Sequence, residues 1–118
     1  MAYSFSEKDG VQILSVDNLL NPLDNQEIIR AVEDKIEAKF TEFVVDLEQM
    51  DFMNSIGLTF LISILTRSRN AGGDVGIANL SENIKKILLV TRLNSAFSIY
   101  GNVEDALSFF EKEKKNSL

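Results

Sequence analysis

Along the chain, stretches in which apolar and polar residues alternate give way to stretches in which apolar residues recur every three or four positions. Alternation is typical of β-strands, and the longer period is typical of helices packed on a core. Residues 3–8 alternate and residues 11–16 are mostly apolar, so with a turn at Gly10 they predict a β-hairpin. Shorter apolar runs predict strands at residues 43–47, 75–78 and 97–100.

The helical period occurs four times. Asp24 and Glu27 have the spacing of a capping box, and the apolar residues that follow predict a helix to about Lys39. Residues 55–70 predict a second helix, which ends at Gly72. Ser81 and Asn102 are expected to cap the last two helices, whose apolar stripes are Ile84, Ile87, Leu88 and Thr91, and Val103, Ala106, Leu107 and Phe110.

The predicted order of elements is ββαβαβαβα. Alternating strands and helices connect by right-handed crossovers, so we expect an α/β fold with a mixed, largely parallel sheet of about five strands and four helices. A chain of 118 residues accommodates one such domain, residues 1–118. The charged tail, residues 112–118, is expected to fray.

Composition excludes several functions. The net charge of −6 is the reverse of the basic excess that a nucleic-acid binder usually shows. The chain has no cysteine or histidine, which excludes disulfides, thiolate or histidine metal sites and a Ser-His nucleophile pair. No metal site or cofactor is predicted. Asp46, Glu48 and Asp51 read as strand-end and turn residues, and no catalytic residue is predicted. No signal layout or bilayer-length apolar stretch is visible, which predicts a cytoplasmic protein without membrane insertion.

The stretch of residues 51–62 joins the central predicted strand to a strongly apolar helix. Ser55 stands where this helix begins, and a helix N-terminus offers free N–H groups and a positive dipole end that would hold a phosphate attached there. Gly57, in the first turn, would let another molecule approach the backbone. The alternative is structural, because Ser or Asn before an apolar helix is ordinarily a cap.

The same helix carries apolar residues on two sides. Leu58, Leu61, Ile62 and Leu65 share one face, which we expect to pack on the sheet. Ile56, Phe60 and Ile64 recur every four residues on another side and predict a partner surface next to Ser55. The alternative is that the chain itself covers this helix on both sides.

Together these features resemble a STAS domain of the anti-sigma-factor antagonist family. The family's usual motif after the central strand is an apolar pair followed by Asp-Ser-Ser/Thr-Gly-Leu, and this chain has Phe52-Met53-Asn54-Ser55-Ile56-Gly57-Leu58. The resemblance covers nearly the whole chain and includes residues 44–47, 71–78, 93–100 and 104–107. No single piece is diagnostic, but the ordered set is fairly specific.

The resemblance implies a phosphorylation switch. Such a protein binds an anti-sigma factor that is also a serine kinase and thereby releases a sigma factor. The kinase then phosphorylates the residue matching Ser55, and a metal-dependent serine phosphatase reverses the modification. Partner contacts are expected at Asn21, Asn54, Ile56, Gly57, Phe60 and Ile64.

The chain departs from the family pattern at three positions. Asn54 replaces the acid before the serine, Asn21 stands where an acid is frequent before the first helix, and Ile56 replaces a second hydroxyl residue. Both asparagines could simply cap helices. The alternative function is therefore a constitutive STAS interaction subunit of a signalling scaffold or transporter, without phosphorylation. A nucleotide or small-molecule site ranks lower because no Walker-type loop is present.

Overall fold

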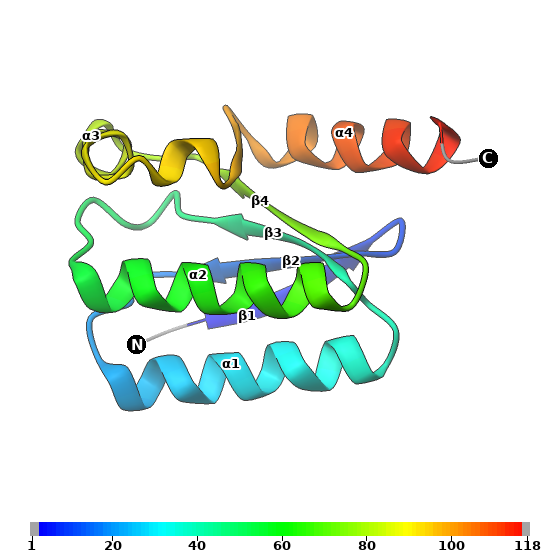
Figure 1. The fold of residues 1–118 in the computed structure, drawn as a ribbon, viewed down its shortest axis with the longest axis horizontal. Coiled ribbons are helices and arrows are strands. Elements are labelled where there is room, and N and C mark those ends of the chain that lie inside the picture. The colour runs from blue at the N-terminus through cyan, green and yellow to red at the C-terminus, as the bar shows by residue number, and fades with distance from the viewer. Residues whose placement is uncertain (1–2, 117–118) are drawn as a thin grey trace.

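The computed structural model describes residues 3–116, which form a five-stranded sheet with four α-helices (Figure 1). The strands follow the order β1-β2-β3-β4-β5 across the sheet; β1 is antiparallel to β2, and the remaining pairs are parallel. The predicted fold class and element order are thus confirmed. The elements are β1 Tyr3–Lys8, β2 Val11–Val16, α1 Pro22–Glu37, β3 Glu42–Asp46, α2 Ser55–Asn70, β4 Asp74–Ala78, α3 Glu82–Val90, the 3-10 turn η1 Leu93–Ser95, β5 Ser98–Tyr100 and α4 Val103–Asn116.

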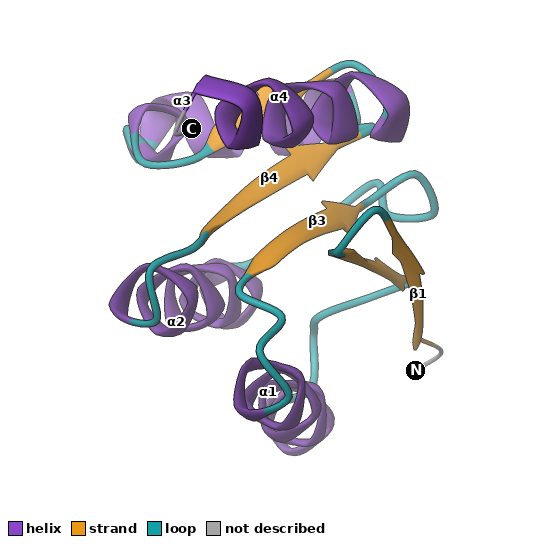
Figure 2. Cartoon of the chain, turned by 90° about the vertical axis from the view of Figure 1, so that its right-hand side faces the viewer, coloured by secondary structure: helices purple, strands orange, loops and turns teal. Residues whose placement is uncertain are grey.

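Helices cover both faces of the sheet, as Figure 2 shows with α1 and α2 on one side and α4 on the other. The larger apolar core lies on the α1 and α2 side and includes Leu14, Val45 and Ile77 from three neighbouring strands. The smaller core packs Ala106 and Phe110 of α4 against the other face. Burial on both faces explains why β3 and β4 are short, nearly continuous apolar runs.

Local capping signals were mostly predicted correctly. Ser81 Oγ accepts a hydrogen bond from the Ile84 N–H (3.1 Å), and Asn102 Oδ1 accepts one from the Asp105 N–H (2.8 Å). The hairpin turn has Asp9 and Gly10 at positive φ, which matches the two-residue turn that follows the twist of the strands.

Two helix boundaries differ from the prediction. Helix α1 begins at Pro22 under an Asn21 cap rather than at Asp24, and it ends at Glu37 because Lys39 takes a left-handed conformation (φ 80°). Proline suits the first helical position because its missing N–H would have no partner there. Helix α4 extends to Asn116 and so includes residues 112–116 of the charged tail. Residues 117 and 118 lie outside the described part of the chain.

The register brings three loops to one edge of the sheet. Ser15 pairs with Asp46, and Asp46 pairs with Ala78, so β2, β3 and β4 end side by side. We call the loops that follow them, residues 17–21, 47–54 and 79–81, the carboxyl edge. Ligands and partners of open α/β sheets favour this edge, and α2 starts from it (Figure 1).

Candidate functional site

Ser55 is the first residue of α2, and its side chain is exposed. The cap is its neighbour: Asn54 Oδ1 accepts hydrogen bonds from the N–H groups of Ile56 (3.0 Å) and Gly57 (3.4 Å). Asn21 caps α1 in the same way, accepting from the N–H groups of Leu23 (2.9 Å) and Asp24 (3.2 Å). Both asparagines therefore have a structural role, and the Ser55 hydroxyl is not needed as the cap.

This capping corrects one expectation about phosphate. The first-turn N–H groups were expected to be free, but Asn54 already occupies those of Ile56 and Gly57. A phosphate on Ser55 would have to share or displace that cap to use them. If the cap stays in place, the positive end of the helix dipole still stabilises a phosphate on Ser55, as it stabilises any negative charge there.

Hydrogen bonds between loops fix the segment that leads to Ser55. Asn79 Nδ2 donates to Asp46 Oδ1 (3.0 Å), which ties the end of β3 to the loop after β4. Ser81 Oγ donates to the Asp51 carbonyl oxygen (3.3 Å), and Asn83 Nδ2 donates to Asp51 Oδ2 (3.3 Å). The approach to Ser55 is thereby attached to the start of α3.

The predicted outward face of α2 is wrong for two of its three residues. Phe60 is only 2% exposed and Ile64 only 1%. The buried face of α2 consists of Gly57, Phe60, Leu61, Ile64, Leu65 and Ser68. Helix α1 lies alongside α2 and covers it together with the sheet, which was the alternative considered for this helix. Ile62, expected to face the sheet, is exposed instead.

Gly57 has a packing role within the chain. A Cβ atom at this position would lie 2.5 Å from Cγ of Met53 and 3.3 Å from Cβ of Leu19. The expected close approach to Gly57 therefore exists, but it is made by this chain's own side chains and not by another molecule.

Three exposed apolar side chains lie in the loops of the carboxyl edge or in the first turn of α1, and the periodicity did not single them out. Leu23 is 81% exposed, and Leu20 and Phe52 are also exposed. Phe52 belongs to the apolar pair before Asn54, whereas Leu23 lies outside the buried stripe of α1. We call Leu20, Leu23 and Phe52 the apolar trio.

A shallow groove of about 240 Å³ separates the N-terminal halves of α1 and α2. The half-buried Ile56 lines this groove, and Ile29 and Phe60 are the other large apolar residues that line it. Gln26, Thr59 and Ser63 supply polar groups at the same groove. Of the three residues predicted for the outward face, only Ile56 keeps substantial exposure next to Ser55.

The charge at the carboxyl edge has one sign. Asp17, Glu48 and Asp51 lie in its loops, and Asp24 and Glu82 lie in the first turns of α1 and α3. No lysine or arginine occurs in residues 17–24, 47–54 or 79–82. A partner that covers this edge therefore has to bring positive charge or leave these carboxylates in water.

We predict that Asn54→Ala lowers the free energy of unfolding by about 1 kcal/mol, because two N–H groups of α2 lose their acceptor. Asn54→Asp is the matched control, since it keeps an acceptor and adds a charge that the helix dipole favours. Urea unfolding of the three proteins checks this. Equal loss of stability in both variants would contradict the capping role.

Residues 3–116 contain neither a membrane-spanning helix nor a metal-binding cluster. No helix there has both the length and the apolar character needed to cross a bilayer. Within the same residues, no three carboxylates gather closely enough to hold a metal ion.

The chain thus combines a five-stranded mixed sheet with an exposed serine at the start of an Asn54-capped second helix. A sequence model of the family described as the STAS domain matches residues 3–106. The chain therefore belongs to the STAS domain family.

Individual relatives resemble the chain over most of its length. A Bordetella bronchiseptica protein, BtrV, named provisionally as an anti-sigma factor antagonist, is 18% identical over 94% of this chain and 96% of its own. TM1081 of Thermotoga maritima superposes with a TM-score of 0.81 at 20% identity, covering 90% of this chain and 92% of that one. The anti-sigma factor antagonist SpoIIAA, in its unphosphorylated form, has a TM-score of 0.79 at 15% identity, covering 94% and 97%.

The fold also occurs as part of a larger protein. SLC26A9 matches 92% of this chain with 21% of its own length, at a TM-score of 0.72 and 14% identity. At these identities the solved structures establish the shared fold alone.

Proposed function

We propose that the chain is an anti-sigma factor antagonist that binds an anti-sigma factor with serine kinase activity and is switched off by phosphorylation of Ser55. Membership of the STAS family and relatives that carry this name support the proposal. The observation that carries it is local: Ser55 is exposed at the start of α2, three residues after the exposed Phe52.

The proposed contact surface differs from that expected from periodicity. Ser55 and Ile56 stay in it, with the capping residues Asn21 and Asn54 beside them, and the apolar trio replaces Phe60 and Ile64. Exposed apolar side chains supply area whose burial favours association, and the surrounding carboxylates favour a partner with positive charge.

Phosphorylation would end the contact by changing the centre of this surface. It adds roughly −1.5 to −2 charges at neutral pH and three oxygens that retain water. The start of α2 tolerates negative charge, so the fold is expected to persist while the partner is lost. A serine phosphatase would restore the binding form. The proposal places this cycle in the cytoplasm and gives the chain no catalytic reaction of its own.

The decisive experiment combines the purified chain with the serine kinase that is its proposed partner and ATP. We expect one phosphate per chain, located at Ser55 by mass spectrometry, and none on Ser55→Ala. Thr59→Ala is the matched control, because Thr59 is also exposed on the first turns of α2 and should not affect labelling. Labelling of another residue in place of Ser55 would refute the proposed switch.

A second candidate is a constitutive interaction subunit that is never phosphorylated. The Asn54 cap favours it, because the residue at the position of the family's acid is here an uncharged N-cap of α2. The occurrence of the fold within SLC26A9 also favours it. Stable binding of the kinase domain with no phosphate transfer in the same experiment would support this candidate.

A further inference from the structure

The outer side of α3 carries a stripe that the proposed function does not use. Ile84 and Leu88 are buried, whereas Lys85, Lys86, Leu89 and Val90 face solvent at helical spacing. Val90 is 82% exposed, and Leu89 is exposed as well. A hollow of about 250 Å³ adjoins them, lined by Lys86, Ile87, Val90 and Thr91.

This stripe is basic in an acidic protein. Residues 83–103 contain Lys85, Lys86 and Arg92 and no acidic residue, although the whole chain has 18 acidic residues. Lys85 pairs with Glu82 (3.2 Å). Among the ion pairs within residues 3–116, none includes Lys86 or Arg92.

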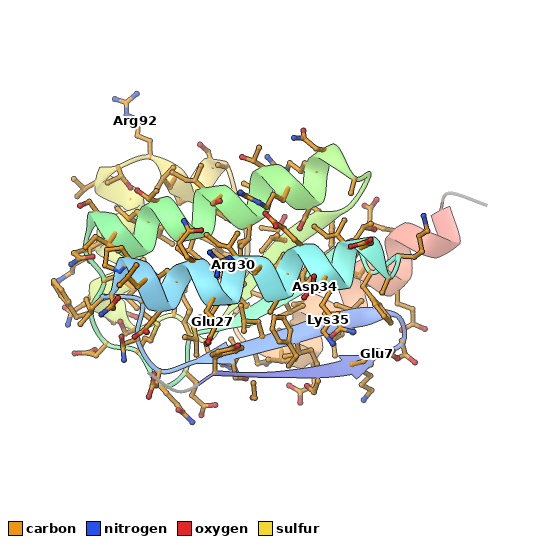
Figure 3. All side chains as sticks on the ribbon, turned by 90° about the horizontal axis from the view of Figure 1, so that it is seen from below. Glu7, Glu27, Arg30, Asp34, Lys35 and Arg92 are labelled. Atoms are coloured by element: carbon orange, nitrogen blue, oxygen red, sulfur yellow. The ribbon has the colours of Figure 1, made fainter. Side chains whose placement is uncertain are left out.

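Arg92 has a backbone conformation that glycine or asparagine ordinarily occupies. It follows the C-cap of α3 at φ 64°, and its N–H donates to the Leu89 carbonyl oxygen (3.1 Å). Its side chain points away from the rest of the molecule in Figure 3. We call Lys86, Leu89, Val90 and Arg92 the basic stripe.

We propose that the basic stripe binds the carboxyl edge of a second copy of this chain. That edge has the complementary character, since it contains the exposed Leu20 and Phe52 together with carboxylates such as Glu48 and Asp51, and contains no lysine or arginine. Apolar side chains would meet apolar side chains, and cations would meet carboxylates.

The placement of the two surfaces allows both contacts to form at once. Helix α3 and the start of α2 lie at the same end of the molecule (Figure 1), and Ser81 and Asn83 of the α3 segment are hydrogen-bonded to Asp51. In a two-fold dimer each contact between unlike surfaces occurs twice. The stripe of each copy then covers the edge of the other.

Charge argues against a membrane as the occupant. An anionic bilayer attracts each nearby cation weakly, and the chain brings three cations on this segment with a net charge of −6. Only Leu89 and Val90 are available on α3 for insertion.

The dimer has a consequence that rests on the proposed function. Helix α2 begins with Ser55 directly after the carboxyl edge, so self-association would cover Ser55 and compete with binding of the kinase. Self-association itself can be measured without any kinase, so the two proposals can fail separately.

The test is sedimentation velocity over a roughly hundredfold range of concentration at low salt, where weak contacts are visible. We expect the mass to rise from 13.2 kDa toward twice that value, and high salt to reverse the rise. Lys86→Glu with Arg92→Glu, and separately Glu48→Lys with Asp51→Lys, should each weaken self-association roughly tenfold or more. Lys8→Glu with Lys112→Glu is the control for the stripe variant, with the same charge change on exposed residues outside both surfaces.

Mixing the two charge-reversed proteins is the sharpest step, because in the mixed dimer an acidic stripe meets a basic edge in one contact and the unchanged stripe meets the unchanged edge in the other. We expect association to return in the mixture, with folding of each variant checked by circular dichroism. Leu89→Ser tests the apolar part without changing charge and should also weaken the dimer. A monomer at every concentration, a mixture that stays apart, or wild-type protein that instead floats with phosphatidylserine vesicles would each overturn the proposal.

Discussion

Replacing Phe60 with alanine is expected to lower the free energy of unfolding by about 3–5 kcal/mol, because it empties a site inside the core. Phe60 is 2% exposed and belongs to the cluster that joins α1, α2 and the sheet. Its position every four residues from Ile56 suggested an exposed contact, for which the same substitution would reduce binding more than stability. Denaturant unfolding distinguishes the two.

Ile62→Ala is the matched control on the same helix. Ile62 is exposed, so its truncation should change stability by about 0.5 kcal/mol or less. If Phe60→Ala left the unfolding midpoint near that of the wild type and abolished partner binding, the buried placement of Phe60 would be contradicted. A large loss of stability for Phe60→Ala alone would support it.

Helix α2 shows why periodicity predicted an element but not its orientation. Apolar residues occupy most positions from Ile56 to Leu65, so two different faces fit the helical period. The choice depends on where α1 lies, and that is a tertiary contact between segments about thirty residues apart. The ends of α2, by contrast, depend on local chemistry, and the predicted range of residues 55–70 matches Ser55–Asn70.

Capping was predictable where one candidate stood alone. Ser81 and Asn102 had no rival within their turns, and both accept the expected backbone hydrogen bonds. Before α1, Asn21 and Asp24 were both capable caps, and Asn21 has the position because Pro22 can begin a helix directly after it. The spacing of Asp24 and Glu27 fitted a capping box, but the helix uses the overlapping cap at Asn21 instead.

The candidate site was predictable only where it depends on the local sequence, as the caps do. Ser55 follows from its place at a helix start, which is a local property. Leu20, Leu23 and Phe52 are exposed because no other segment packs over them, and that tertiary property has no pattern along the chain. Gly57 had a sequence signal, but only the positions of Met53 and Leu19 show that the space beside it is filled from within.

Replacing Ser55 with aspartate is expected to weaken binding of the anti-sigma factor by tenfold or more, or about 1.4 kcal/mol at least. Ser55 is exposed in a segment that also holds the exposed Phe52 and the half-buried Ile56, so a carboxylate there would have to lose water when a partner covers the segment. Calorimetric titration of the unphosphorylated kinase partner with each variant measures the loss.

The same substitution should leave stability nearly unchanged, because an exposed negative charge in the first turn of a helix is favourable by about 0.3–1 kcal/mol. Ser55→Asn is the matched control, since it has similar size without the charge and should retain most of the binding. A Ser55→Asp protein that unfolds far more readily than the wild type would show that the hydroxyl is structural. If Ser55→Asn lost binding as severely as Ser55→Asp, bulk rather than charge would operate the switch, because both side chains have nearly the same volume.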